Sequence, residues 1–309
     1  MSNQNSRRDF FKTAILGSML IQSPLFNAFS NTETKTSNSQ AIKIVLFSKC
    51  LQNLDWQELA QACKECGLDG VDLTVRDGGH VIPEKIEVDL PKVVDTFHKT
   101  NLEVSMLTTR LLSADDPFAE SILKTAGALN IPYVRIGYHK YSANLDMQEQ
   151  IQKVKKDLQT LTALAEKYKV VLGYHNHSGF DTFGGPVWDL LSVFQAINSP
   201  FLGSNFDIGH AKAEGFNGAW KTNTVAILPW IRMIAVKDFI VKNHKVEWVP
   251  LGTGCVPVKE MLEIIIKKGN FNGPISIHTE YKIKTQAEAL EYVKTSTQKI
   301  REIIKQIKD

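Results

Sequence analysis

The chain has 309 residues, of which 36 are basic and 33 acidic, for a formal net charge of +3. Residues 1–30 contain three of the basic residues and one acidic residue, so the rest of the chain carries 33 basic and 32 acidic residues. This near-neutral balance argues against nucleic-acid binding, which normally needs a strong basic excess, and the length is sufficient for one large core.

The N-terminal segment has the features of an export signal. Arg7 and Arg8 precede an apolar stretch at 13–29, which ends in a small-x-small pattern that a signal peptidase could cleave. The paired arginines resemble a twin-arginine signal, and the apolar stretch is too short and too interrupted for a stable membrane span. We therefore expect a signal peptide at 1–30, export to the periplasm, and a flexible leader at 31–40. A retained N-terminal anchor is the alternative.

From residue 42 onward, short apolar runs alternate with longer amphipathic segments. The runs predict eight buried strands, at 42–48, 70–76, 104–108, 133–137, 170–175, 202–207, 231–237 and 274–280. The amphipathic segments predict helices near 55–66, 90–99, 116–129, 146–168, 187–196, 258–268 and 285–307, with a short helix near 223–228. Eight strand–helix units in residues 41–309 favour an α/β fold, a single-domain (β/α)8 TIM barrel. A doubly wound sheet is the alternative, but no glycine-rich turn follows the first strand.

In such a barrel, polar residues at the carboxyl ends of the strands are the candidates for chemistry. Because side chains alternate along a strand, the predicted strands turn a set of polar groups toward the barrel interior. The set is Asp72, Thr74, Arg76, Arg135, His175, His177, Asp207, Lys237, His278 and Glu280. Each has a structural alternative: Asp207 could cap the following turn, and Lys237 could form a simple ion pair with Asp72 or Asp207. Their accumulation on several strands nevertheless predicts a polar barrel mouth.

Several of these segments resemble the xylose-isomerase-like TIM-barrel superfamily, over roughly residues 42–307. They are Gly70-Val71-Asp72-Leu73, Tyr174-His175-Asn176-His177, Phe206-Asp207-Ile208-Gly209-His210, Val236-Lys237-Asp238-Phe239, Pro250-Leu251-Gly252-Thr253-Gly254 and Ser276-Ile277-His278-Thr279-Glu280-Tyr281. The superfamily includes sugar isomerases and epimerases, inosose dehydratases and endonuclease IV nucleases. The stretch 71–83 also resembles an exported branch described as sugar phosphate isomerases/epimerases.

The resemblance implies a metal site with altered ligands. In the superfamily's epimerases, Glu, Asp, His and Glu hold one divalent metal, and these positions fall on His175, Asp207, Ala235 and His278. A metal held by His175, Asp207 and His278 is therefore expected. Nitrogen ligands favour zinc, manganese, iron or cobalt. With one ligand position lost to alanine, a metal-free site is the alternative.

The expected activity is that of a carbohydrate isomerase or epimerase that removes a proton next to a carbonyl through an enediolate. The expected catalytic residues are His175, Lys237, His278 and Glu280. The expected substrate-binding residues are Arg76, His80, Arg135, Tyr138, His177, His210 and Trp220. We expect Trp220 in a loop after strand six, where its ring could stack on a sugar. The alternatives are a lyase or dehydratase acting on a keto-glycoside by β-elimination, and a non-catalytic sugar-binding protein. The expected partner is a small carbohydrate, and the sequence leaves the oligomeric state open.

Overall fold

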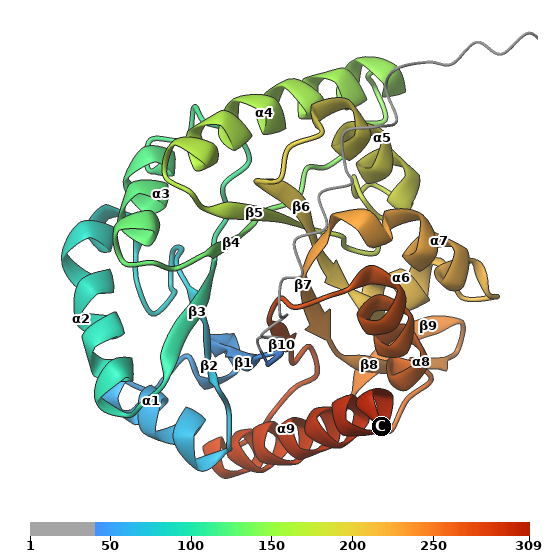
Figure 1. Ribbon diagram of the computed structural model, residues 1–309. Helices are drawn as coiled ribbons and strands as arrows, with labels where there is room; N and C mark the ends of the chain where they lie inside the picture. Colours follow the sequence, from blue (N-terminus) through green and yellow to red (C-terminus); the bar gives the residue numbers. More distant parts are fainter. Residues whose placement is uncertain (1–40) are drawn as a thin grey trace, which may run out of the picture. The chain divides into compact units, whose positions relative to one another are not determined.

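Eight buried apolar runs pair in parallel and close into a barrel in the computed structural model, which describes residues 41–309 (Figure 1). The strands are β1 (Ile44–Phe47), β2 (Gly70–Thr74), β3 (Glu103–Thr108), β4 (Tyr133–Ile136), β5 (Val171–His175), β6 (Leu202–Asp207), β7 (Ile231–Val236) and β10 (Ile275–Ile277). Around the barrel they follow the order β1-β10-β7-β6-β5-β4-β3-β2, so each strand neighbours the next one along the chain. The predicted (β/α)8 TIM barrel is confirmed.

The helices surround the barrel on its outer side (Figure 1). They are α1 (Trp56–Glu65), α2 (Ile86–Lys99), α3 (Ala119–Ala128), α4 (Met147–Lys167), α5 (Val187–Ile197), α6 (Ile208–Glu214), α7 (Ala219–Ile227), α8 (Val258–Glu263) and α9 (Gln286–Lys308). Side-chain caps fix the first turn of several of them. Asp55 and Glu58 form a capping box at α1, and Asp146 caps α4. Such caps satisfy backbone N–H groups that have no partner inside the helix.

The apolar core has two parts. The larger part fills the space between strands and helices, and a small cluster of Val45, Met106 and Met233 fills the barrel interior. The interior cluster depends on Gly173, because a Cβ atom there would lie 2.1 Å from the Cε atom of Met233. This apolar cluster fills the middle of the barrel, so the polar groups gather beyond it, at the carboxyl ends of the strands.

Two of these features were not predicted: helix α6, directly after β6, and a hairpin after β7. After β7 the chain forms an antiparallel hairpin of β8 (Asp238–Lys242) and β9 (Lys245–Val249). Its turn residues Asn243 and His244 have φ angles of 50° and 60°, a conformation that asparagine tolerates better than most residues. The hairpin places Trp248 on strand β9.

The predicted signal peptide at 1–30 and the flexible leader at 31–40 lie outside the described residues. Within residues 41–309, no helix combines the length and the apolar character needed to cross a membrane.

Candidate active site

The predicted polar groups converge at the carboxyl ends of the strands, around a cavity of about 520 Å³. The cavity is lined by Phe47, Lys49, Arg76, Thr109, Arg110, Leu112, Arg135, Gly137, Tyr138, His175, His177, His278 and Glu280. The imidazoles of His175 on β5 and His278, just after β10, stack with ring centres 5.8 Å apart. Strands at distant positions in the sequence therefore present their side chains to the same end of the barrel.

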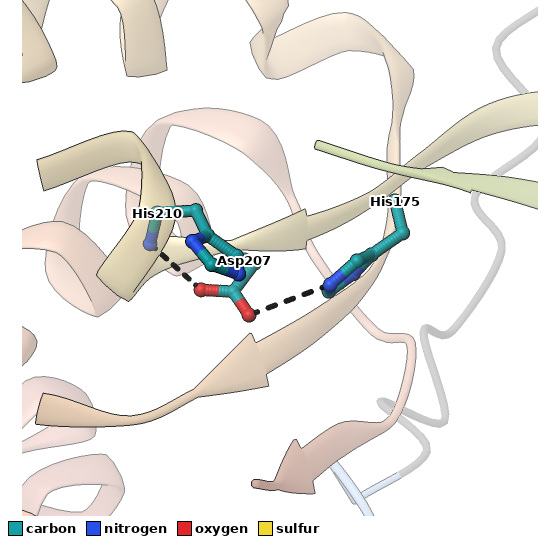
Figure 2. A group of neighbouring side chains, drawn as sticks. All are labelled: His175, Asp207 and His210. Carbon is teal, nitrogen blue, oxygen red and sulfur yellow. Dashed lines mark hydrogen bonds and ion pairs between the residues drawn. The ribbon is translucent and has the colours of Figure 1, made fainter. Parts of the chain in front are cut away.

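Asp207, the last residue of β6, lies between two imidazoles (Figure 2). Its Oδ2 atom is 3.7 Å from Nε2 of His175, and its Oδ1 atom accepts a hydrogen bond from the backbone N–H of His210. The predicted capping role of Asp207 is therefore real, because that bond caps α6. The side chain of Asn176 bonds both the backbone N–H and the C=O of Asp207, at 2.7 and 3.0 Å, which fixes the carboxylate between strands β5 and β6.

Lys237 supplies the positive charge next to this carboxylate. Its ammonium group lies 3.0 Å from Oδ2 of Asp207, 2.7 Å from Nε2 of His210 and 3.5 Å from Oε1 of Glu280. The contacts with His210 and Glu280 are hydrogen bonds, whereas the contact with Asp207 is an ion pair in which Oδ2 accepts no hydrogen bond within residues 41–309. Its side chain is only 3% exposed, and the ammonium lies 4.5 Å from the ring centre of Trp248. The ion pair predicted as an alternative thus exists, with Asp207 as the partner.

A glycine makes room for this lysine. A Cβ atom at Gly209 would lie 2.7 Å from Cγ of Lys237 and 3.1 Å from the indole of Trp248. The absence of a side chain at 209 lets the apolar stem of Lys237 pass between α6 and the hairpin.

His175, Asp207 and His210 could hold a metal ion, because one ligand atom from each lies within 4.8 Å of the others. Two imidazoles and a carboxylate suit zinc and related ions. Both ring nitrogens of His210 are, however, already engaged: Nδ1 lies 2.8 Å from Oγ of Ser178, and Nε2 contacts Lys237. A metal at this triad therefore competes with the ammonium group for two of its three ligands.

His278, which we expected among the metal ligands, lies outside that triad. Its Nε2 atom is 3.7 Å from Oδ2 of Asp72 and makes no hydrogen bond within residues 41–309. Asp72 itself accepts hydrogen bonds from the hydroxyls of Thr108 at 2.6 Å and Ser276 at 2.8 Å. A buried carboxylate with two donors thus faces the buried Nε2 atom of His278, while the ring of His278 lines the cavity.

Burial keeps the histidines of the site neutral. Burial, with the nearby charges of Arg135 and Lys237, lowers the pKa of His175 well below its usual value, and burial with Lys237 does the same for His210. Burial also lowers the pKa of His278, against the opposing effect of Asp72. We call these three the buried imidazoles. The Nδ1 atom of His175 lies 3.2 Å from Oδ1 of Asn205, so the tautomer with its proton on Nδ1 donates to Asn205 and keeps an electron pair on Nε2.

Glu280 is the carboxylate that faces the cavity. Burial alone would raise the pKa of its carboxyl, but Lys237, His278 and Lys49 outweigh burial and hold the pKa below its usual value. Its side chain is 28% exposed. Glu280 is therefore ionised at neutral pH and accessible from the cavity.

Two predicted substrate-binding residues lie away from the cavity. Trp220 is the second residue of α7 and is 8% exposed within the apolar core, so the expected loop position was wrong. The run around it forms a helix whose apolar side packs inward. His80 instead joins the ends of β1 and β2, because its Nδ1 atom lies 3.1 Å from both the Ser48 and Thr74 hydroxyls.

The other predicted substrate-binding residues lie at or near the cavity. Tyr138 stacks on His177, with ring centres 4.7 Å apart, and both line the cavity together with Arg76 and Arg135. The ring of His210 lies 3.8 Å from that of His177, immediately behind the cavity wall. Sequence reasoning missed Lys49 and Arg110, although each follows the end of a strand, β1 or β3, and that position was the available signal.

The glycine pair at 252 and 254 has a structural role. The carboxylate of Asp238 accepts hydrogen bonds from the backbone N–H groups of Gly252, Gly254 and Val256 at 2.8–3.0 Å. These donors are consequently not free to bind a phosphate group, and the segment serves as a turn beside the mouth.

Comparison with known proteins supports the fold assignment. Among curated proteins, no sequence matches the chain. Similar solved structures include a probable 3-DHS dehydratase of Bacillus anthracis (16% identity, TM-score 0.65, covering 83% of this chain and 99% of that one). They also include a D-psicose 3-epimerase of Clostridium cellulolyticum with D-tagatose (10%, 0.67, 85% and 99%). A third is a xylose isomerase-like protein of Mycobacterium smegmatis in complex with magnesium (13%, 0.67, 84% and 97%).

These identities are low and support a shared fold. The family match is the stronger finding, because it covers residues 60–303, which run from within α1 to within α9 and include every barrel strand except β1. It includes every strand from β2 to β10 that carries a residue of the site. The chain belongs to the xylose isomerase-like TIM barrel family.

Proposed function

We propose that the protein is a carbohydrate-active enzyme of the isomerase or epimerase type, which removes a proton from the carbon next to a carbonyl. The observation that carries this proposal is the combination at the cavity floor. An ionised carboxylate (Glu280) and two neutral imidazoles (His175, His278) lie beside buried cations (Arg135, Lys237). Enediolate chemistry requires such a base next to fixed positive charge.

The roles follow from accessibility and charge. Glu280 is the base that takes the proton from carbon, because it is ionised and reachable from the cavity. The negative charge that develops on the carbonyl oxygen is stabilised by Arg135 and Lys237, whose positive charges are fixed before the reaction begins. The protonated Glu280 then returns this proton to the neighbouring carbon directly, or passes it to the free nitrogen of His175, which returns it, so that the Glu280 carboxylate is regenerated in either case.

The cation of the site is part of the proposal. A divalent ion held by His175, Asp207 and His210 would polarise the carbonyl oxygen as a Lewis acid. The relative in complex with magnesium supports a metal, and the nitrogen ligands of this chain favour zinc, manganese, iron or cobalt. The ion pair of Lys237 with Asp207 and its hydrogen bond with His210 support the alternative, in which the ammonium group takes the place of the metal.

A lyase or dehydratase is the second candidate. Glu280 is the only carboxylate among the residues that line the described cavity, so an exchange of protons between two carboxylates cannot operate there. A β-elimination needs a single proton abstraction followed by departure of a substituent. It therefore suits a cavity with one carboxylate, and the dehydratase among the similar structures is consistent with it.

The test is proton exchange in D2O. The purified chain is incubated with neutral ketoses, 3-keto-glycosides and uronic acids, with and without added Mn²⁺ or Zn²⁺, and the products are analysed by mass spectrometry and NMR. Deuterium at the carbon next to the carbonyl is expected, with unchanged mass otherwise for isomerisation, or with loss of water or a substituent for elimination. Glu280→Gln should lower the exchange rate by about 100-fold or more, whereas Glu288→Gln on the outer helix α9 should not.

If no compound exchanges deuterium while sugars still raise the melting temperature, the protein is a non-catalytic sugar-binding barrel and the enzyme proposal is wrong. We also propose, from the N-terminal sequence alone, that the protein is exported to the periplasm.

A further inference from the structure

Positive charge is concentrated on one wall of the cavity. Arg76, Arg110 and Arg135 follow or lie on the adjacent strands β2, β3 and β4, and all three line the cavity. With Lys49, the lining carries four basic side chains against the single carboxylate of Glu280. The whole sequence, in contrast, is nearly balanced, with 36 basic and 33 acidic residues. The imbalance is therefore a local property of the mouth.

These arginines have no acidic partner within residues 41–309. None of the three guanidinium groups forms an ion pair or a side-chain hydrogen bond there, and Nε of Arg135 is buried without any partner. Arg135 is only 7% exposed. An unpaired charge at such a depth is costly unless an anion accompanies it, so the absence of a partner indicates that a ligand supplies one.

The arginines are held in place by an aromatic ring. The guanidinium carbons of Arg76 and Arg135 lie 5.4 and 5.5 Å from the ring centre of Phe47, the last residue of β1. The same ring stacks on His278 at 4.5 Å. Phe47 thus links the arginine wall to the imidazole at the cavity floor, and a ligand bound by the arginines lies next to the proposed reaction centre.

We propose that the substrate carries an acidic group, a carboxylate or a phosphate, that is bound by Arg76, Arg110 and Arg135. The proposal rests on the proposed function, because it treats this cavity as the substrate site. Planar guanidinium groups bind both kinds of anion through paired hydrogen bonds. Burial, together with Arg110, lowers the pKa of Arg76, and burial lowers the pKa of Arg135, as expected for a wall built to receive negative charge.

The test is binding, measured by calorimetry on the purified chain independently of turnover. The ligands are hexuronates, hexose phosphates and the neutral hexoses of the same stereochemistry, with acetate and inorganic phosphate as controls. At least one acidic sugar should bind about tenfold or more tightly than its neutral counterpart, equivalent to one charge-assisted contact. Tighter binding of a hexuronate would identify the acidic group as a carboxylate, and tighter binding of a hexose phosphate would identify it as a phosphate. If neither acidic sugar exceeds the neutral one, or if the free anions bind as tightly as the acidic sugars, the proposal is wrong.

Variants locate the binding site. Arg76→Gln and Arg110→Gln should each weaken binding of the acidic sugar about tenfold more than they weaken binding of the neutral sugar. Arg301→Gln, on the outer helix α9, should change neither. Arg135→Leu should keep or raise the melting temperature without ligand, because it removes an unpaired buried charge, but should lose the rise caused by the acidic sugar. Unaltered affinity in all three cavity variants would contradict the proposal.

The binding experiment and the deuterium-exchange experiment can fail independently of each other. Tight binding of an acidic sugar without deuterium exchange would leave the anion site standing and reject the enzyme. Exchange on a neutral ketose, with no preference for acids, would support the enzyme and reject the anion site.

Discussion

Replacement of Lys237 by methionine removes the buried cation and tests the charge balance of the site. Methionine retains the apolar stem but leaves the carboxylate of Asp207, which is fully buried, without its ion-pair partner at 3.0 Å. At an effective dielectric constant of about 20, two unit charges at this distance attract by about 5 kcal/mol. Measured losses for one partner of a buried pair are about 3–5 kcal/mol, and we expect Lys237→Met to lower the free energy of unfolding by that amount.

The assay is urea unfolding followed by circular dichroism at pH 7.5. Lys221→Met is the matched control, because it breaks an exposed pair with Glu260 and should cost at most about 1 kcal/mol. The double variant Lys237→Met with Asp207→Asn should recover at least about 2 kcal/mol of the loss, since asparagine carries no charge and still caps a helix. The reasoning is refuted if Lys237→Met costs no more than Lys221→Met, or if the double variant is no more stable than the single one.

Two further predictions concern stability. The pKa values of the three buried imidazoles are lowered in the folded state, so below about pH 6.5 the unfolded chain binds more protons. Their contribution to the free energy of unfolding is complete above that pH. As the pH drops further, this contribution decreases by up to about 4 kcal/mol per pH unit. Urea unfolding between pH 7.5 and 5, with a chelator present, should show this slope. The variant His278→Gln should reduce the slope by about a third. The control His98→Gln, at an exposed position, should leave the slope unchanged. Gly173→Ala should cost about 1–3 kcal/mol through its clash with Met233, and Met233→Val should relieve that cost; equal losses in the single and double variants would show that the clash is not the cause.

The barrel was predictable because each parallel strand is buried on both faces and therefore reads as a continuous apolar run. The hairpin β8–β9 lacks that signal. Its second strand is mostly exposed, and the sequence around it, Lys242-Asn243-His244-Lys245, is polar. Asn243 was the indication of the turn in the sequence, because asparagine adopts a positive φ angle more readily than most residues, and both turn residues have positive φ angles in the structure.

The end of the barrel that carries the site was also predictable, whereas the pairing inside it was not. Alternation along the strands placed Asp72, Asp207 and Lys237 on the inner side, but both carboxylates remained possible partners for the lysine. The choice of Asp207 depends on the spacing around the closed barrel, where β6 and β7 are direct neighbours. In contrast, Asp72 on β2 is already engaged by hydroxyls of β3 and β10.

The position of Ala235 connects the altered ligands to the lysine. The family resemblance places a metal-binding histidine at this residue, which in this chain contributes only a buried methyl group on β7, next to Asp207 in the sheet register. Lys237 follows two residues later, forms an ion pair with Asp207 and a hydrogen bond with His210, and so contacts two members of the possible metal triad. A divalent ion about 4 Å from an ammonium group would be repelled by about 8 kcal/mol at an effective dielectric constant of 20. An ion at the triad would therefore compete with a charged Lys237 for Asp207, and both the loss of one ligand at Ala235 and the placement of the lysine support the proposed alternative, in which the ammonium group is the cation of the site.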